Sequence, residues 1–122
     1  MTLSQRVASL AGPDREVDEA IQCALVGAEI EWSNIRQSNC YYRDGHWVNI
    51  GEINLYTASL DAAMTLVPEG WKVDYIQELL DEHLCTAGLY RRVEGREIER
   101  VSGNGLFLHT ALASAALSAR GL

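Results

Sequence analysis

Two hydrophobic periodicities alternate along this sequence, and their alternation limits the fold more than any other feature. Apolar residues that recur every three or four positions predict an amphipathic helix, and apolar residues that alternate with polar ones predict a strand. The helical spacing covers Asp14–Val26, Ser59–Val67 and Ala111–Arg120. The alternating spacing covers Trp71–Tyr75, Leu84–Val93 and Arg96–Val101. We therefore predict an α+β fold in which about three main helices pack on a mainly antiparallel sheet.

The first of these helices has clear signals at its start. Pro13 suits the first position of a helix, and Asp14 and Glu16 are expected in the first turn, where acids interact favourably with the helix dipole. Its polar side is expected to carry Asp18, Glu19 and Gln22, facing away from the core.

The other two helices have weaker boundaries. Either Thr57 or Ser59 is expected to cap the middle helix, and Pro68 with Gly70 ends it. The last helix is expected to start at the cap Thr110, after a glycine-rich break at Ser102–Gly105.

The local signals conflict in one segment, Ile76–His83. The segment contains good helix formers, but strand-like sequences precede and follow it. We therefore predict a strand, a hairpin and a returning strand, with Glu94 and Gly95 forming the next turn. The predicted core consists of Val17, Ile21, Leu25, Leu60, Met64, Val67, Trp71, Val73 and Leu112.

Length and charge narrow the class of protein. The 122 residues are enough for one domain with a buried core, so residues 1–122 are expected to form a single domain. Acidic residues outnumber basic ones 17 to 10, and the net charge of −7 disfavours general nucleic-acid binding. No apolar run is long enough to span a membrane, and the N-terminus lacks the apolar core of a signal peptide. We expect a cytoplasmic protein without membrane association.

Two clusters could bind a ligand. Tyr42 and Trp47 lie in a hairpin predicted around Asp44-Gly45, where their rings either pack across the strands or stack on a planar ligand. The densest run of positive charge is on a later hairpin, Arg91–Arg100, which carries Arg91, Arg92, Arg96 and Arg100. Arginines that alternate with glutamates there either protect a sheet edge from aggregation or bind an anion.

No catalytic or metal-binding arrangement is apparent. Ser59 lacks the strand–turn–helix motif of a hydrolase nucleophile and suits a helix cap better. His83 and Cys85 have ligand spacing on a strand, but they would need two further ligands to hold zinc. We expect no cofactor and no catalytic residue, and an enzyme is the less favoured class.

Three segments resemble small proteins encoded by phages and prophages of proteobacteria, of the phage ABA sandwich type. These segments are LAGPDREVDEAIQCAL, YTASLDAAMTLVPEGW and HTALASAALSARGL. The last segment has Ala111 where a proline often follows the capping threonine in that family. The resemblance implies an α/β/α layered sandwich and an intracellular phage product in the host bacterial cytosol, and it implies no catalytic residues.

From these observations we expect a phage accessory binding protein without catalysis. Such a protein would counter host defence by sequestering a small anionic, nucleotide-derived signalling molecule. The expected ligand-binding residues are Arg91, Arg92 and Arg96, with Trp47 or Tyr42. A homo-oligomer is expected, because two copies of a short domain can build a deeper pocket than one. The alternatives are a protein-binding inhibitor of a host protein, whose acidic surface meets a basic partner, and an enzyme without a recognisable motif.

Overall fold

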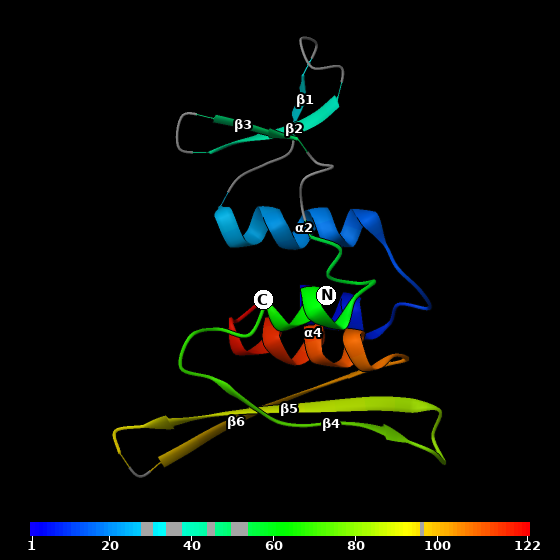
Figure 1. Cartoon of the computed structure of the whole chain (residues 1–122), viewed down its shortest axis with the longest axis vertical. Coiled ribbons are helices and arrows are strands. Elements are labelled where there is room, and N and C mark those ends of the chain that lie inside the picture. The colour runs from blue at the N-terminus through cyan, green and yellow to red at the C-terminus, as the bar shows by residue number, and fades with distance from the viewer. Residues whose placement is uncertain (28–30, 34–37, 44–45, 50–53, 96) are drawn as a thin grey trace.

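The chain forms two antiparallel sheets with helices between them (Figure 1). The computed structural model describes residues 1–27, 31–33, 38–43, 46–49, 54–95 and 97–122; for residues 32–33, 38–39, 41–43 and 46–49 it describes the backbone alone. The helices are α1 (Leu3–Ala8), α2 (Arg15–Val26), α3 (Leu60–Met64) and α4 (Leu108–Ala119). One sheet consists of β1 (Glu31–Ser33), β2 (Ser38–Arg43) and β3 (His46–Asn49). The other consists of β4 (Lys72–Leu79), β5 (Leu84–Val93) and β6 (Glu97–Gly105).

The predicted α+β fold, with helices packed on an antiparallel sheet, is confirmed. The sheet has the order β4-β5-β6, so β5 is its central strand. Figure 1 shows α4 lying directly on this sheet, with α1 and α3 next to α4, α2 beyond them and the sheet β1–β3 farthest away. Contacts of α4 with β4, β5, β6, α1 and α3 make it the centre of the structure.

The conflicting segment Ile76–His83 is strand followed by turn, as predicted. Strand β4 runs to Leu79, and residues 80–83 form the turn that leads into β5. Leu79 pairs with Leu84 across the hairpin, and His83 adopts a positive φ of 50° at the end of the turn. The turn at Glu94 and Gly95 also forms where it was expected, before β6.

The glycine-rich segment Ser102–Gly105 is not a break in the chain, contrary to prediction; it is the last part of β6. Gly103 and Gly105 are buried on the side of the strand that faces α4. A methyl group on Gly103 would overlap the backbone nitrogen of Ala115, and one on Gly105 would meet the first turn of α4 at Thr110. These glycines therefore bring the helix backbone against the strand, a close approach that glycine alone permits.

Helix α4 is buried around its whole circumference from Thr110 to Leu117. Its alanines are small enough for the sheet to pack on one side of the helix and for α1 and α3 to pack on the other. The buried hydroxyl of Ser114 donates to the carbonyl oxygen of Ser4 in α1 at 3.0 Å, and the Ser4 hydroxyl donates to the Ser114 carbonyl oxygen at 2.8 Å. This exchange satisfies the polar atoms that α4 carries into the core.

The predicted start of α4 is wrong. The N-cap residue is Phe107, and Thr110 lies inside the first turn. There the Thr110 hydroxyl accepts from the Phe107 backbone N–H at 3.2 Å and donates to the Phe107 carbonyl oxygen at 3.1 Å. The predicted starts of the other two helices lie closer to the starts seen in the structure. Asp14 is the N-cap of α2 and Pro13 precedes it, while Ser59 is the N-cap of α3.

Most of the predicted core is confirmed. Val17, Ile21, Trp71 and Leu112 are buried, and the partly buried residues packed on the core are Leu25, Val67 and Val73. Leu60 and Met64 are exposed, and this part of the prediction is wrong. Helix α3 is only five residues long and turns Ala63 towards the core, so Leu60 and Met64 project on its flank.

The contact between β6 and α4 leads to a direct test. Gly103→Ala places a methyl group against helix backbone that cannot rotate away, so we expect the free energy of unfolding to fall by about 3 kcal/mol, the upper end of the usual cost of overpacking. Gly12→Ala is the matched control, because a methyl group there meets no atom within 4 Å. Urea unfolding of both variants measures the loss of free energy of unfolding. An equal and small loss in the two variants would contradict the close contact between β6 and α4.

Candidate functional site

The structure brings two of the predicted arginines into one surface hollow. This cationic hollow has a volume of about 380 Å³ and is lined by Gly70, Lys72, Tyr90, Arg91 and Arg92. Lys72 and Tyr90 are partners in the register of β4 and β5, so Lys72 lies on the same face of the strand pair as Tyr90 and Arg92, while the Arg91 side chain leaves the opposite face. None of the lining residues that the structure describes carries a carboxylate, although the chain as a whole is acidic.

Arg91 is held in position by two neighbours. Its guanidinium lies over the ring of Trp71, 4.8 Å from the centroid, a favourable cation–π distance. Its Nε donates to Oε2 of Glu99 on β6 at 2.7 Å, and its Nη2 lies 2.6 Å from the same oxygen. Both side chains of this ion pair are nearly half exposed, so the pair orients Arg91 more than it stabilises the fold.

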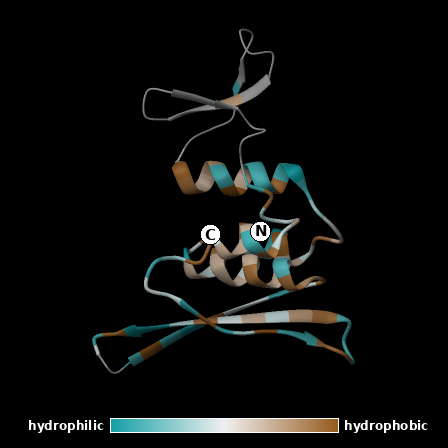
Figure 2. Ribbon diagram, viewed as in Figure 1, coloured by the Kyte–Doolittle hydropathy of each residue, from teal (hydrophilic) through white to brown (hydrophobic). Residues whose placement is uncertain are grey.

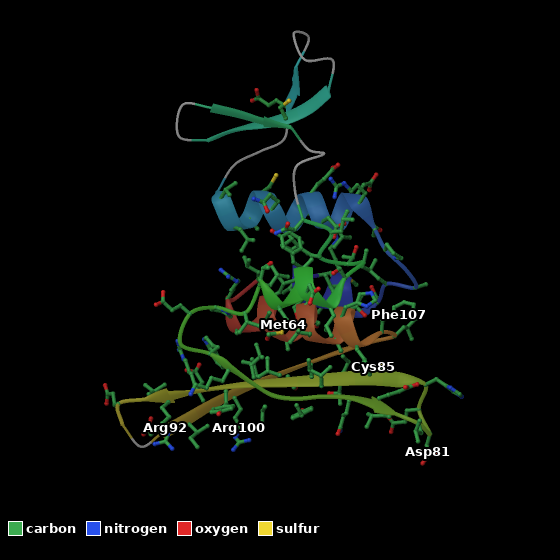
Figure 3. The ribbon with its side chains drawn as sticks, viewed as in Figure 1. Met64, Asp81, Cys85, Arg92, Arg100 and Phe107 are labelled. Carbon is green, nitrogen blue, oxygen red and sulfur yellow. The ribbon has the colours of Figure 1, made fainter. Side chains whose placement is uncertain are left out.

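Lys72 and Arg92 carry the unneutralised charge of the cationic hollow. Within the described part of the chain, neither forms an ion pair with a carboxylate, and both are exposed. Arg100, which pairs with Asp74 at 3.1 Å, lies outside the lining. Figure 3 shows Arg92 and Arg100 on the same part of the sheet, on the side away from α4.

The other predicted ligand-binding residues lie elsewhere. Tyr42 and Trp47 are register partners in the sheet β1–β3, and helices separate that sheet from β4–β6 in Figure 1. Arg96 and the turn Asp44-Gly45 lie outside the described residues. The residues that sequence reasoning missed are Lys72, Trp71 and Tyr90. A lone lysine next to a tryptophan gave a weak signal for the first two, but the strand register that adds Tyr90 is visible only in the structure.

Edge protection does not explain Arg91 and Arg92. These residues lie on β5, which is the central strand and has no free edge. The alternating charges Glu97, Glu99 and Arg100 do lie on the edge strand β6, where they suit that role. Edge protection therefore suits the charges of β6 and does not explain those of β5, and anion binding by Arg91 and Arg92 stays a prediction.

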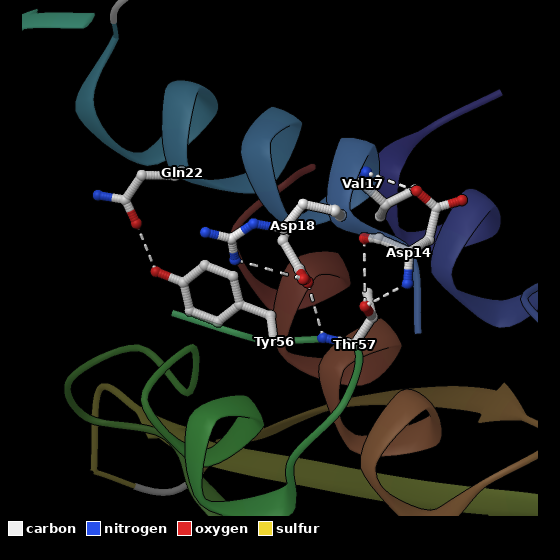
Figure 4. Close-up of polar contacts among 7 residues, drawn as sticks. Asp14, Val17, Asp18, Gln22, Tyr56 and Thr57 are labelled. Atoms are coloured by element: carbon white, nitrogen blue, oxygen red, sulfur yellow. Dashed lines mark hydrogen bonds and ion pairs between the residues drawn. The ribbon is translucent and has the colours of Figure 1, made fainter. Parts of the chain in front are cut away.

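A second polar cluster links α2 to the segment before α3 (Figure 4). The carboxylate of Asp18 accepts the backbone N–H of Thr57 at 2.8 Å and lies 3.9 Å from Arg15. The Thr57 hydroxyl accepts from the backbone N–H of Asp14 at 2.8 Å, and the Tyr56 hydroxyl donates to Gln22 at 2.6 Å. Asp18 was expected to face away from the core, and this prediction is wrong.

Asp18 is a structural group because a substrate cannot reach it. Only 1% of its surface is exposed. Burial raises the pKa of its carboxyl above the ordinary 3.8, opposed by the hydrogen bonds from Thr57 and by the charge of Arg15. Its role is to fasten α2 to the Tyr56–Thr57 segment.

Neither a nucleophile nor a metal cluster is evident in the described residues. Ser59 accepts the backbone N–H of Ala62 at 3.3 Å, which confirms its role as a helix cap. Cys85 is buried, and burial followed by the charge of Glu78 raises the pKa of its thiol, which opposes formation of the reactive thiolate. Among the residues that the structure describes, no three His, Cys, Asp or Glu side chains come together as metal ligands.

No protein-family model matches the chain, and comparisons with characterised proteins and with solved structures also found no match. The resemblance to the phage ABA sandwich type stays a prediction. In the described parts of the chain, no helix has the length and apolar character needed to cross a membrane.

Asp18 gives a prediction about pH. Because its pKa is raised in the fold, the folded state binds the proton more tightly than the unfolded chain does, and stability falls as pH rises from the ordinary value of 3.8 through the folded pKa. Asp18→Asn removes this dependence and keeps an oxygen that can accept from Thr57. The free energy of unfolding of Asp18→Asn relative to the wild type should therefore increase between about pH 4 and pH 7.

Urea unfolding across that pH range measures the effect. Glu16→Gln removes an exposed carboxylate from the first turn of the same helix and controls for the change in net charge. A relative stability of Asp18→Asn that stays constant or decreases as pH rises would contradict the raised pKa.

Proposed function

We propose that the cationic hollow binds a small phosphate-bearing anion and that the protein holds this ligand without transforming it. The observation that carries the proposal is one hollow lined by Lys72, Arg91 and Arg92, with no carboxylate among the lining residues that the structure describes. In a protein with a net charge of −7, such a grouping costs self-repulsion among the cations, and Lys72 and Arg92 have no ion-pair partner in the described part of the chain.

The chemistry of the lining suits phosphate oxygens. Arginine offers a planar fork of N–H donors, and lysine adds a compact positive charge. Arg91 is already oriented by Trp71 and Glu99, so little conformational entropy is lost when it donates to a ligand. Tyr90 supplies an aromatic ring at the same hollow. The volume of about 380 Å³ lies in the lower part of the range for small-molecule sites, about 300–1,000 Å³.

A nucleotide-derived molecule is the ligand class that uses all of these groups. Its phosphates would meet the cations, and its base would have a ring to stack on. The expected role in phage counter-defence rests on the sequence resemblance and is part of this proposal. The expected homo-oligomer and the cytoplasmic location stay predictions.

A thermal-shift panel of linear and cyclic nucleotides tests the proposal. A ligand at about 100 times its dissociation constant should stabilise the fold by about 2.7 kcal/mol. Arg92→Ala and Lys72→Ala should each abolish most of this stabilisation. Arg100→Ala should retain it, because Arg100 pairs with Asp74 and lies outside the lining although it is on the same sheet.

A second measurement on the same protein and nucleotides separates binding from catalysis. Mass spectrometry of the nucleotide recovered from the protein should show it unchanged. The proposal fails if no nucleotide stabilises the wild type, or if Arg92→Ala and Arg100→Ala respond alike. A chemically altered nucleotide would identify an enzyme.

A further inference from the structure

The opposite end of the sheet β4–β6 has a different surface. Here the turn between β4 and β5 lies beside the connection from β6 to α4, since Cys85 pairs with Gly105 and its sulfur lies 3.8 Å from the carbonyl oxygen of Leu106. Figure 3 shows Asp81 and Phe107 at this end, away from Arg92 and Arg100. We call it the acidic apolar end and define it by Glu78, Leu80, Asp81, Glu82, Leu106, Phe107 and Leu108.

Four large apolar side chains of the acidic apolar end face solvent. Leu80 is 78% exposed, Leu106 47%, Phe107 38% and Leu108 41%. In Figure 2 the hydrophobic colour reaches the end of the sheet at the β4–β5 turn. The Phe107 ring stacks on His109 with centroids 5.3 Å apart and planes 11° from parallel, so its orientation is set before any partner arrives. An aromatic ring held among exposed aliphatic residues is typical of the anchor of a protein interface.

The charges around these side chains all have one sign. The sequence has no lysine or arginine from residue 73 to 90 or from residue 101 to 119. Glu78, Asp81 and Glu82 are exposed, and in the described part of the chain none of the three forms an ion pair. Leu80 is therefore followed directly by two carboxylates, Asp81 and Glu82, and the exposed apolar side chains and the three carboxylates lie at the same end of the sheet, with no ion pair of these carboxylates in the described part of the chain.

We propose that the acidic apolar end is a docking surface for a basic, amphipathic segment of another protein. Apolar side chains of that segment would cover Leu80 and Phe107, and its lysines or arginines would meet Glu78, Asp81 and Glu82. Charge complementarity selects this occupant. A second copy docked through the same surface would bring the three carboxylates against their own equivalents, and an anionic lipid surface would repel them.

This inference is independent of the anion-binding proposal, because the two surfaces share no residue. The acidic apolar end lacks the cations that a phosphate needs, and the cationic hollow lacks exposed aliphatic side chains. One chain would thus carry two sites of opposite charge at the two ends of one sheet.

A pair of defined peptides tests the docking surface. One is an amphipathic helical peptide of about 14 residues made of leucine and lysine, a length at which an isolated helix becomes marginally stable. The other has glutamate at every lysine position. Each is titrated into the ¹⁵N-labelled full chain, and amide chemical shifts are followed. The lysine peptide should perturb residues 78–84 and 105–109, and the glutamate peptide should not.

Two double variants locate the contact. Leu80→Ser with Phe107→Ser should weaken binding of the lysine peptide at least about tenfold, as expected when an interface loses its anchors. Leu60→Ser with Met64→Ser is the matched control, because it removes apolar side chains of 41% and 44% exposure from α3, and it should leave binding unchanged. Retained dispersion of the amide spectrum shows that each variant is folded.

Three results would overturn the proposal. One is the absence of shifts at residues 78–84 and 105–109 with the lysine peptide. Another is an equal loss of binding in the two double variants, which would indicate non-specific apolar contact. The third is a concentration-dependent dimer of the free protein that Leu80→Ser with Phe107→Ser disperses, since a second copy would then be the occupant.

Discussion

The close contact between the backbone of α4 and strand β6 is the constraint on which the rest of this structure depends. Gly103 and Gly105 remove the side chains that would separate helix from strand, and Ala111 and Ala115 do the same on the helix. Helix and strand therefore approach more closely than larger side chains would allow. The gain is dispersion energy along the contact, and the cost is that no added atom is tolerated there.

Burial of α4 fixes the positions of the other elements. Because α4 is covered on every side from Thr110 to Leu117, α1 and α3 must pack where the sheet does not. Two hydrogen bonds attach helix α2 to the segment before α3: Asp18 accepts from Thr57, and Gln22 accepts from Tyr56. The sheet β4–β6 extends beyond α4 at both ends in Figure 1, and each end is left to present its own surface. One end carries Lys72, Arg91 and Arg92, and the other carries exposed leucines, Phe107 and carboxylates.

Local sequence patterns were enough to predict the class of fold and most elements. The periodicities of Val17 and Ile21, and of the segment Leu84–Val93, report which side of an element is buried, and the structure agrees with them. The same patterns failed where a distant residue decides the outcome. In isolation, the sequence around Gly103 and Gly105 resembles a loop. In the structure it is part of a strand, because these glycines pair with β5 and let the backbone of α4 pack directly on them.

The candidate site shows the same limit. Arg91 and Arg92 are adjacent in sequence, so their proximity could be predicted, whereas Lys72 joins them only through its register with Tyr90. Asp18 looks like a solvent-facing acid on an amphipathic helix until the N–H of Thr57, 39 residues away, supplies its partner. Leu60 and Met64 have helical core spacing, but the short α3 turns Ala63 inward instead. Each of these outcomes depends on tertiary contacts that local propensity does not contain.

Native-state hydrogen exchange of α4 tests the central role of this helix most directly. If the contact of α4 with β6 supports the whole structure, the amides of Ala113–Leu117 should exchange only when the protein unfolds globally. Their exchange free energies should then agree with the free energy of unfolding from urea to within about 1 kcal/mol. Exchange of these amides through local opening, several kcal/mol below global unfolding while the amides of β5 stay protected, would show that the sheet stands without α4 and would contradict the account.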